Sequence, residues 1–289
     1  MKEQQHRNPF GQPIVESSDW RKELRQSWIN YMVDTLGLLE SDALDRANDE
    51  INNSIADRYC GFLISQGFTF DGKRILDIGC GHGTLAIEMA IRGGVVVGIE
   101  PGEAWRLVAQ KRVAKLRCKK RITILAGEAE ALPCADSSFD YVLSVQVLEH
   151  VKYPKNAIKE LKRVLKPNGI VYVSCENYLA FREQHYKIPW LPLLPKKLGA
   201  LYLKFKGRNP NFLFNDITYI TYPQLIWYFL QAGLWSRKWP ERYLRFNRWL
   251  QYGLILWLHK RNLFGIGFLH FLKIIHQPDN PVDSTNSII

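Results

Sequence analysis

The chain has 289 residues, of which 46% are hydrophobic, and 39 Lys and Arg against 28 Asp and Glu give it a formal net charge of +11. This apolar content is ordinary for a globular protein and ample for a core. The five scattered cysteines form no C-x-x-C pair, which argues against a disulfide framework and against a cysteine-rich zinc site.

The start of the chain, MKEQQHRNPFGQP, is polar and lacks the apolar stretch of a signal peptide. No segment approaches the roughly 18–20 uninterrupted apolar residues of a membrane-spanning helix. We therefore expect a cytoplasmic protein, and peripheral contact with a membrane is left open.

Apolar residues recur at helical spacing between Asp19 and Gln66, and two or three helices are expected there. Strands and helices then alternate. The expected strands are Arg74–Ile78, Val95–Ile99, Ile122–Leu125, Phe139–Val145 and Gly169–Cys175, and the helices between them are Thr84–Arg92, Glu103–Lys115 and Pro154–Leu165. This alternation predicts an α/β fold with a doubly wound (Rossmann-like), mainly parallel seven-stranded sheet, which binds ligands at the carboxyl ends of its strands.

The pattern becomes less regular after Cys175. The stretch IPWLPLLPKKLG is too rich in proline for one helix. Helices are expected at Tyr222–Ala232 and from about Tyr243 to His259, and a final strand near Phe268–His276 precedes a polar tail.

A glycine-rich turn, ILDIGCGHGTLAIE at 75–88, predicts a nucleotide site between the first strand and its helix. The dinucleotide pattern G-x-G-x-x-G does not fit, because the third glycine, Gly83, comes one residue early. In a dinucleotide site the carboxylate of Asp77 would lie near the negatively charged pyrophosphate. A ligand that carries an ammonium group would instead compensate the charge of this acid. Glu100 ends the next strand, where a carboxylate can accept from ribose hydroxyls. These features describe S-adenosylmethionine.

At these residues the sequence resembles the class I S-adenosylmethionine-dependent methyltransferases of small-molecule type, and in general character the quinone-biosynthesis O-methyltransferases. The resemblance covers roughly Gly72 to Ser174. The similar blocks, in order, are LDIGCGHG (Leu76–Gly83), VVVGIEP (Val95–Pro101), GEAEALPCADSSFDYVLSVQVLEHV (Gly127–Val151) and ELKRVLKPNGIVYVS (Glu160–Ser174).

The resemblance implies S-adenosyl-L-methionine as cofactor and assigns it a set of binding residues. Asp77, Gly79 and Gly81 would line its methionine part, with Cys80 and Gly83 in the same turn. Glu100, followed by Pro101, would hold the ribose, and Glu128 with Ala129 would flank the adenine. Ser144 and Gln146 would face the reactive methyl. Many relatives have aspartate at the Glu128 position, so this chain departs from the pattern there.

Methyl transfer to a hydroxyl or a protonated amine requires removal of a proton. Candidate bases are His150 in LEHV and His185 in FREQHY, with Tyr186 as a neighbour in the same role. A structural hydrogen-bonding role is the alternative for His150. No metal is expected, because Glu149 and His150 are adjacent and neighbours on a helix point apart.

The final third of the chain is basic and aromatic. Up to Cys175 there are 24 basic and 22 acidic residues, against 15 and 6 afterwards. Together with a basic band at Lys196, Lys197, Lys204, Lys206 and Arg208, this suits an anionic surface or ligand. The other interpretation is that these aromatic residues form ordinary core and the lysines a solvated face.

We predict a methyltransferase that acts on a small-molecule acceptor of apolar or anionic character, through a hydroxyl oxygen and at a membrane surface. A nucleic-acid methyltransferase is less favoured, because the fourth strand ends in SVQVLEH and not in an N-P-P-[YFW] motif. A third hypothesis is a cofactor-binding pseudoenzyme acting as a partner subunit. The expected domains are a tail and helical lid at 1–70, the cofactor-binding core at 71–175, and a substrate-side segment at 176–289 that completes the sheet.

Overall fold

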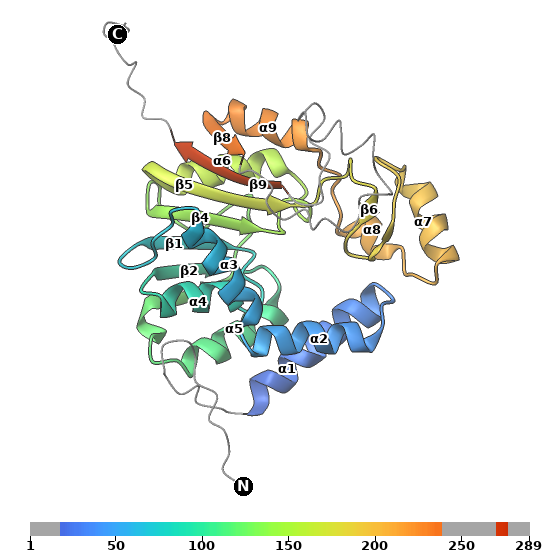
Figure 1. The fold of residues 1–289 in the computed structure, drawn as a ribbon, viewed down its shortest axis with the longest axis horizontal. Coiled ribbons are helices and arrows are strands. Elements are labelled where there is room, and N and C mark those ends of the chain that lie inside the picture. Colours follow the sequence, from blue (N-terminus) through green and yellow to red (C-terminus); the bar gives the residue numbers. More distant parts are fainter. Residues whose placement is uncertain (1–17, 239–269, 277–289) are drawn as a thin grey trace, which may run out of the picture.

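The computed structural model describes residues 18–238 and 270–276 (Figure 1). The helix expected from about 243 to 259 lies outside the described residues. Helices α1 (Ser18–Ile29), α2 (Glu40–Ile51) and α3 (Ser54–Ser65) precede the first strand, and a π-helical turn η1 (Asn30–Thr35) extends α1. The expectation of two or three helices before the sheet is confirmed.

A seven-stranded sheet forms the centre of the molecule, in the order β3-β2-β1-β4-β5-β9-β8. The five strands from β3 to β5 are parallel, while β9 pairs antiparallel with both β5 and β8. The strands are β1 (Arg74–Ile78), β2 (Val95–Ile99), β3 (Ile122–Leu125), β4 (Phe139–Val145), β5 (Leu165–Cys175), β8 (Leu234–Lys238) and β9 (His270–His276). The predicted sheet is confirmed, and its strand order reverses between β1 and β4, where open α/β sheets bind their ligands.

Two expectations about strands need correction. Strand β5 begins at Leu165, four residues before the expected start, because Leu165 already pairs with Phe139. Asn168 has a left-handed φ of 62° within this strand, and the pairing register shifts there. Strand β8 was not expected, because its residues LWSRK show no clear alternation and follow directly on a helix.

Helices cover both faces of the sheet (Figure 1). On one face, α3, α4 (Thr84–Ile91) and α5 (Glu103–Ala114) pack against the strands. On the other face, α6 (Pro154–Val164) and α9 (Tyr222–Gln231) bury residues such as Leu161 and Phe229. Helix α9 begins with a capping box, in which Thr221 and Gln224 satisfy each other's backbone amides. A short 3-10 turn, η2 (Lys119–Arg121), precedes β3.

A third buried cluster joins parts of the chain that are far apart in sequence. Residues of α1 and η1, among them Leu24 and Met32, pack with residues between 178 and 217, among them Tyr186 and Phe212. The later segment contains the hairpin β6 (Arg182–Glu183) and β7 (Ile188–Pro189) and the helices α7 (Lys196–Phe205) and α8 (Asn211–Asn215). In Figure 1 this segment lies beyond the carboxyl ends of the parallel strands. The cluster therefore places the N-terminal helices and residues 178–217 around one end of the sheet.

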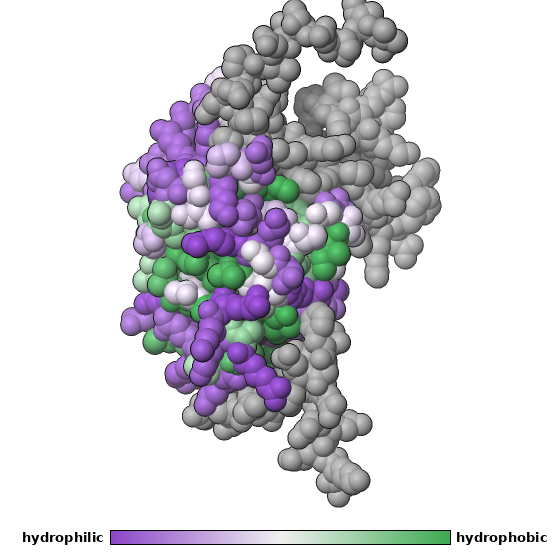
Figure 2. Space-filling view, turned by 90° about the vertical axis from the view of Figure 1, so that its left-hand side faces the viewer, coloured by the Kyte–Doolittle hydropathy of each residue, from purple (hydrophilic) through white to green (hydrophobic). Residues whose placement is uncertain are grey.

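The opposite end of the molecule, from which the parallel strands start, mixes hydrophilic residues with smaller hydrophobic areas (Figure 2). Among the described residues, none of the helices combines the length and the apolar character needed to cross a membrane.

Candidate active site

A cavity of about 1100 Å³ opens at the carboxyl ends of the strands. Its walls come from α1 to α3, from the glycine turn, and from the segments that follow β2, β3, β4 and β5. Most of the residues predicted for the site line this cavity: Asp77, Gly79, Cys80, Gly81, Glu100, Pro101, Glu128, Ala129, Gln146, His150 and His185. Residues as far apart in the sequence as Asp77 and His185 therefore share one space.

Three predicted residues lie outside the lining. Gly83 packs its backbone toward α5, where an added Cβ would lie 3.2 Å from the Cβ of Ala109. Ser144 is buried within β4. Tyr186 is fully buried, and its hydroxyl donates to the carbonyl of Asn209 at 2.7 Å. Gly83 and Tyr186 thus contribute to packing in the fold, and the site roles predicted for them and for Ser144 stay predictions.

The glycine turn has a backbone that only glycine adopts readily. Gly79, Gly81 and Gly83 have φ of 65°, 55° and 75°. A Cβ at Gly79 would collide with the side chain of Val147, and one at Gly81 would lie 3.3 Å from the ring of Trp105. The missing side chains at Gly79 and Gly81 therefore let Val147 and Trp105 pack directly against the main chain of the turn.

Asp77 is the buried acid of this turn. The residue is 2% exposed, and its Oδ2 atom has no hydrogen-bond partner among the residues that the structure describes. Burial, with the nearby charge of Glu100, raises the pKa of Asp77 to about 7. An unpartnered carboxylate oxygen in such a place fits the ammonium group of an amino-acid ligand, whose charge would compensate the buried acid.

The hydrogen bonds of Glu100 orient its carboxylate so that it can bind a diol. Its Oε2 accepts from the amide of Gly81 and its Oε1 accepts from the amide of Gly102, each at 2.8 Å. Each carboxylate oxygen keeps a second lone pair, so both can still accept from ribose hydroxyls. Glu128 is exposed, follows strand β3 and also lines the cavity. The residues present thus fit S-adenosylmethionine from its amino acid to its base.

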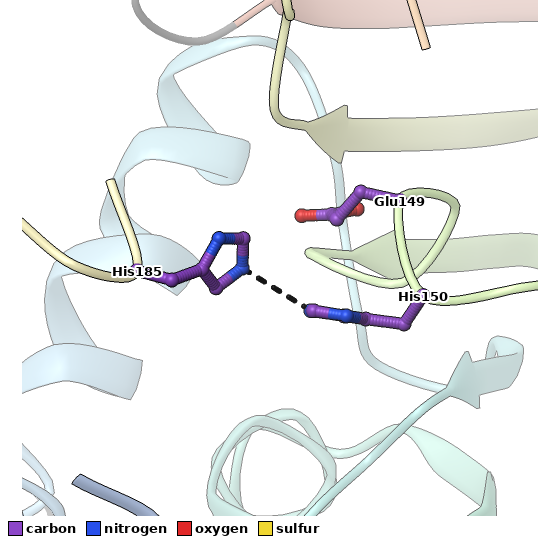
Figure 3. A group of neighbouring side chains, drawn as sticks. All are labelled: Glu149, His150 and His185. Carbon is purple, nitrogen blue, oxygen red and sulfur yellow. Dashed lines mark hydrogen bonds between the residues drawn. The ribbon is translucent and has the colours of Figure 1, made fainter. Parts of the chain in front are cut away.

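The other half of the cavity contains a pair of facing histidines (Figure 3). The Nε2 atoms of His150 and His185 lie 3.3 Å apart. The Nδ1 of His150 lies 2.9 Å from the carbonyl of Asp216, and the Nδ1 of His185 lies 2.8 Å from Glu183 Oε1. Because a carbonyl and a carboxylate only accept, both Nδ1 atoms must carry hydrogen. A third hydrogen, carried by one of the two Nε2 atoms, then forms the hydrogen bond between the rings.

Charge decides which ring holds that shared proton. Burial alone would lower the pKa of His185, but the hydrogen bond to Glu183 and the charges of Glu183, Glu149 and Glu176 raise it to about 9. Desolvation lowers the pKa of His150. The proton therefore resides on His185, and His150 offers an unprotonated Nε2 at neutral pH.

Gln146 connects this half of the cavity to the end of β4. It has a left-handed φ of 56°, which is strained for a residue other than glycine. With the amide nitrogen facing the acids, it donates to Glu149 and Glu176, each at 3.1 Å. Burial, with the charges of Glu149 and Glu183, raises the pKa of Glu176 to about 8, against an opposing effect of His185.

Glu149, His150 and His185 also have the composition of a metal site, because their ligand atoms all lie within 4.8 Å of one another. The expectation that Glu149 and His150 point apart is wrong, since residues 148–150 form a turn and not a helix. The expectation that the protein needs no metal stays a prediction.

Several lining residues were not identified from the sequence. Trp28 and Tyr31 come from α1 and η1, Trp105 from α5, and Phe212 from α8. The Trp28 and Trp105 rings meet edge to face at 5.2 Å, and Tyr31 meets Phe212 at 5.5 Å. Helical spacing marked Trp28 and Tyr31 only as apolar positions, and nothing local in the sequence shows which of these face a ligand.

Comparison with known proteins gives a consistent result. Residues 76–173 match the model of the methyltransferase domain family. A ubiquinone biosynthesis O-methyltransferase of Pseudomonas putida is 32% identical over 179 residues, which are 56% of this chain and 74% of the relative. A protein of the same name from Dinoroseobacter shibae is 39% identical over 153 residues, or 50% of this chain and 59% of the relative.

Solved structures share the fold. A Listeria monocytogenes protein assigned as an S-adenosylmethionine-dependent methyltransferase aligns with a TM-score of 0.53 at 18% identity, over 77% of this chain and 98% of its own. The [4+2]-cyclase SpnF aligns with a TM-score of 0.50 at 19% identity, over 78% and 81%. Sequence relatives, sheet order and the geometry of the glycine turn agree: the chain belongs to the class I S-adenosylmethionine-dependent methyltransferases.

Proposed function

We propose that this enzyme transfers a methyl group to a hydroxyl oxygen of an apolar, aromatic small molecule. The observation that carries the proposal is the His150–His185 pair, which opens into the same cavity as the glycine turn. Relatives named ubiquinone biosynthesis O-methyltransferases support oxygen as the methylated atom. Bound S-adenosylmethionine supplies an activated methyl on sulfur, so the chain must orient the acceptor and remove its proton.

His150 is the general base in this proposal. The acceptor hydroxyl replaces His185 as the donor to His150 Nε2, and His150 takes the proton while the oxygen forms its bond to the methyl carbon. The protonated His185, held by Glu183, donates from its own Nε2 to the developing oxyanion. Bound S-adenosylmethionine would supply the methyl group and keep the electron pair of the bond that it loses, and the proton on His150 passes to solvent.

The shape and composition of the cavity favour an apolar ring as the acceptor. Tyr31, Met32 and Leu36 on the N-terminal side and Phe212 on α8 line the cavity, and the Phe212 ring lies 5.7 Å from the ring of His150 and 5.4 Å from that of His185. The hydroxyl of Tyr31 is no competing base, because burial and the charges of Glu183, Glu149 and Asp216 raise its pKa. Aromatic walls bind a flat ring by stacking and edge contacts.

We also propose that α7 brings this cavity to an anionic membrane surface. Leu198, Leu201 and Phe205 are 55%, 64% and 83% exposed and follow one another at helical spacing. Lys197, Lys204 and Lys206 lie exposed on or next to the same helix. Apolar residues flanked by lysines are typical of a helix that lies in the interface of an anionic bilayer. Helix α7 packs on α8, whose Phe212 lines the cavity.

Methyl transfer from labelled S-adenosylmethionine to a catechol carrying a hydrocarbon chain tests the proposal. His150→Gln should lower kcat by about 10²–10⁴-fold, the usual contribution of general base catalysis, and leave the affinity for S-adenosylhomocysteine unchanged. Tyr186→Phe is the control, because its hydroxyl lies outside the cavity lining, and its kcat should stay near that of wild type. Wild-type turnover in His150→Gln would refute the role of the base.

A further inference from the structure

His82 occupies the one position of the GCGHG turn that is neither glycine nor the small Cys80, and the methyl-transfer chemistry makes no use of it. Its side chain is fully buried. Nδ1 lies 3.0 Å from Glu50 Oε2 on α2, and Nε2 lies 2.6 Å from Ser27 Oγ on α1. One ring thus joins the cofactor turn to two helices that precede the sheet.

The chemistry of the partner fixes the direction of the contact to Glu50. Glu50 can only accept, so His82 Nδ1 donates to it. The Ser27 hydroxyl lies within hydrogen-bond distance of both the Leu24 carbonyl, at 2.9 Å, and His82 Nε2, and the tautomer of the ring sets the direction of the second contact. The His82 ring is thus buried between the Glu50 carboxylate and the Ser27 hydroxyl and is hydrogen-bonded to both.

The surroundings hold the pair in place from other elements. The His82 ring stacks on Trp105 of α5, with centroids 4.4 Å apart and planes 5° from parallel. Arg112 of α5 donates to the carbonyl of His82 at 2.8 Å and to Thr84 Oγ1 at 2.7 Å. Thr84 donates in turn to Glu50 Oε2 at 3.1 Å.

Glu50 is stabilised in its charged form. Burial alone would raise its pKa, but the hydrogen bond and charge of His82, with the charges of Arg46 and Arg112, lower the pKa to about 2. Because this buried carboxylate needs its hydrogen-bond and charge partners, the contact to His82 restricts where α2 can lie, and the contact to Ser27 does the same for α1.

We propose that Ser27 and Glu50 are positioning residues for cofactor binding, which act through His82 on the glycine turn. Gly81, next to His82, gives its amide to Glu100 at 2.8 Å, and Trp105 lies against the same glycine. A shift of the His82 ring therefore moves the amide that orients the ribose acid and the ring that walls the cavity. The same contacts hold α1 and α2, which line the cavity, against the glycine turn.

Titration of S-adenosylhomocysteine into the full chain tests this inference. Ser27 is absent from the cavity lining, so Ser27→Ala removes no direct contact with the ligand. We expect its Kd to rise about threefold or more and that of Glu50→Gln about tenfold or more, the latter equal to about 1.4 kcal/mol. Unfolding of each ligand-free variant, followed by circular dichroism, separates loss of affinity from loss of fold.

The chain offers a matched control for each variant. Ser65 Oγ donates to the carbonyl of Phe62 three residues earlier, as Ser27 does to Leu24, but Ser65 lies on α3 and makes no contact with the glycine turn. Glu88 is a buried acid paired with Arg92 on α4, outside the cavity lining. Ser65→Ala and Glu88→Gln should bind S-adenosylhomocysteine as wild type does.

Two outcomes would overturn the inference. Kd within twofold of wild type in Ser27→Ala would show that the contact to α1 does not reach the ligand site. Equal losses of affinity in each variant and its control would show that general stability is responsible. Alanine is the better helix former, so Ser27→Ala decides the question even if Glu50→Gln does not fold.

Discussion

Replacing Asp77 by asparagine should stabilise the ligand-free protein while weakening cofactor binding. The pKa of this buried acid is raised from an ordinary 3.8 to about 7. A carboxyl whose pKa is higher in the folded than in the unfolded state lowers the free energy of unfolding at any pH above its unfolded-state pKa. This loss of stability reaches its full size once the pH exceeds the folded-state pKa. About three units correspond to about 4 kcal/mol at pH 8. The asparagine avoids this cost, because it carries no charge to bury.

Urea unfolding of ligand-free wild type and Asp77→Asn at pH 5 and pH 8 measures this effect. At pH 5 the folded wild type keeps Asp77 protonated while the unfolded chain ionises it, so the gain from the substitution should be about 1.6 kcal/mol and should grow to about 4 kcal/mol at pH 8. A gain that is absent at pH 8, or equal at both pH values, would refute the assignment of the buried charge.

The same substitution should remove a proton release that accompanies cofactor binding. A cationic ligand favours ionised Asp77, so binding at pH 6.5 to wild type expels a proton, and the affinity falls as pH drops below about 7. Calorimetric titration of S-adenosylmethionine in two buffers with different ionisation enthalpies measures the protons released. Equal proton release by wild type and Asp77→Asn would contradict the role given to this residue.

Three further substitutions test other parts of the structure. Gly79→Ala should abolish cofactor binding in calorimetry. It should also lower the free energy of unfolding by about 1–2 kcal/mol from the left-handed backbone alone, with a further loss from the collision with Val147. Unfolding at the wild-type free energy would refute this. Glu183→Gln should lower the pKa of His185 from about 9, which NMR titration measures. The free energy of unfolding should then no longer decline as the pH rises toward 9. An unchanged titration of His185 would exclude its pairing with Glu183. Phe205→Ser should weaken binding to anionic vesicles about tenfold, since burying a phenylalanine contributes about 1.5–3 kcal/mol, and leave the affinity for S-adenosylhomocysteine unchanged; undiminished vesicle binding would refute contact through α7.

The cofactor half of the site was predictable because its determinants are local. Strand β1, the glycine turn and Glu100 lie within 27 residues, and each has a recognisable residue type at a fixed spacing. Parallel strands place their carboxyl ends at one edge of the sheet, so motifs following β1, β2 and β3 must converge. Residue type, spacing and strand direction together therefore specify which side chains meet around the cofactor.

The acceptor half depends on contacts between distant segments, which no local pattern encodes. Tyr31 meets Phe212, and His150 meets His185, only because residues 178–217 pack against α1 and η1. The prolines of 189–195 ruled out one long helix but did not indicate the hairpin or α7. Adjacent Glu149 and His150 were expected to diverge, because a helix was assumed where the chain makes a turn.

The distribution of charge connects the two halves. The chain is basic as a whole, yet Asp77 and Glu100 lie at one end of the cavity, and Glu149, Glu176 and Glu183 surround the histidines at the other. In the proposed reaction, a proton arrives on His150 beside an already protonated His185. Two neighbouring imidazolium rings would repel each other in an apolar cavity, where charges interact strongly. The buried carboxylates of Glu149 and Glu183 offset that repulsion, which gives a physical reason for acids that neither the cofactor nor the acceptor contacts require.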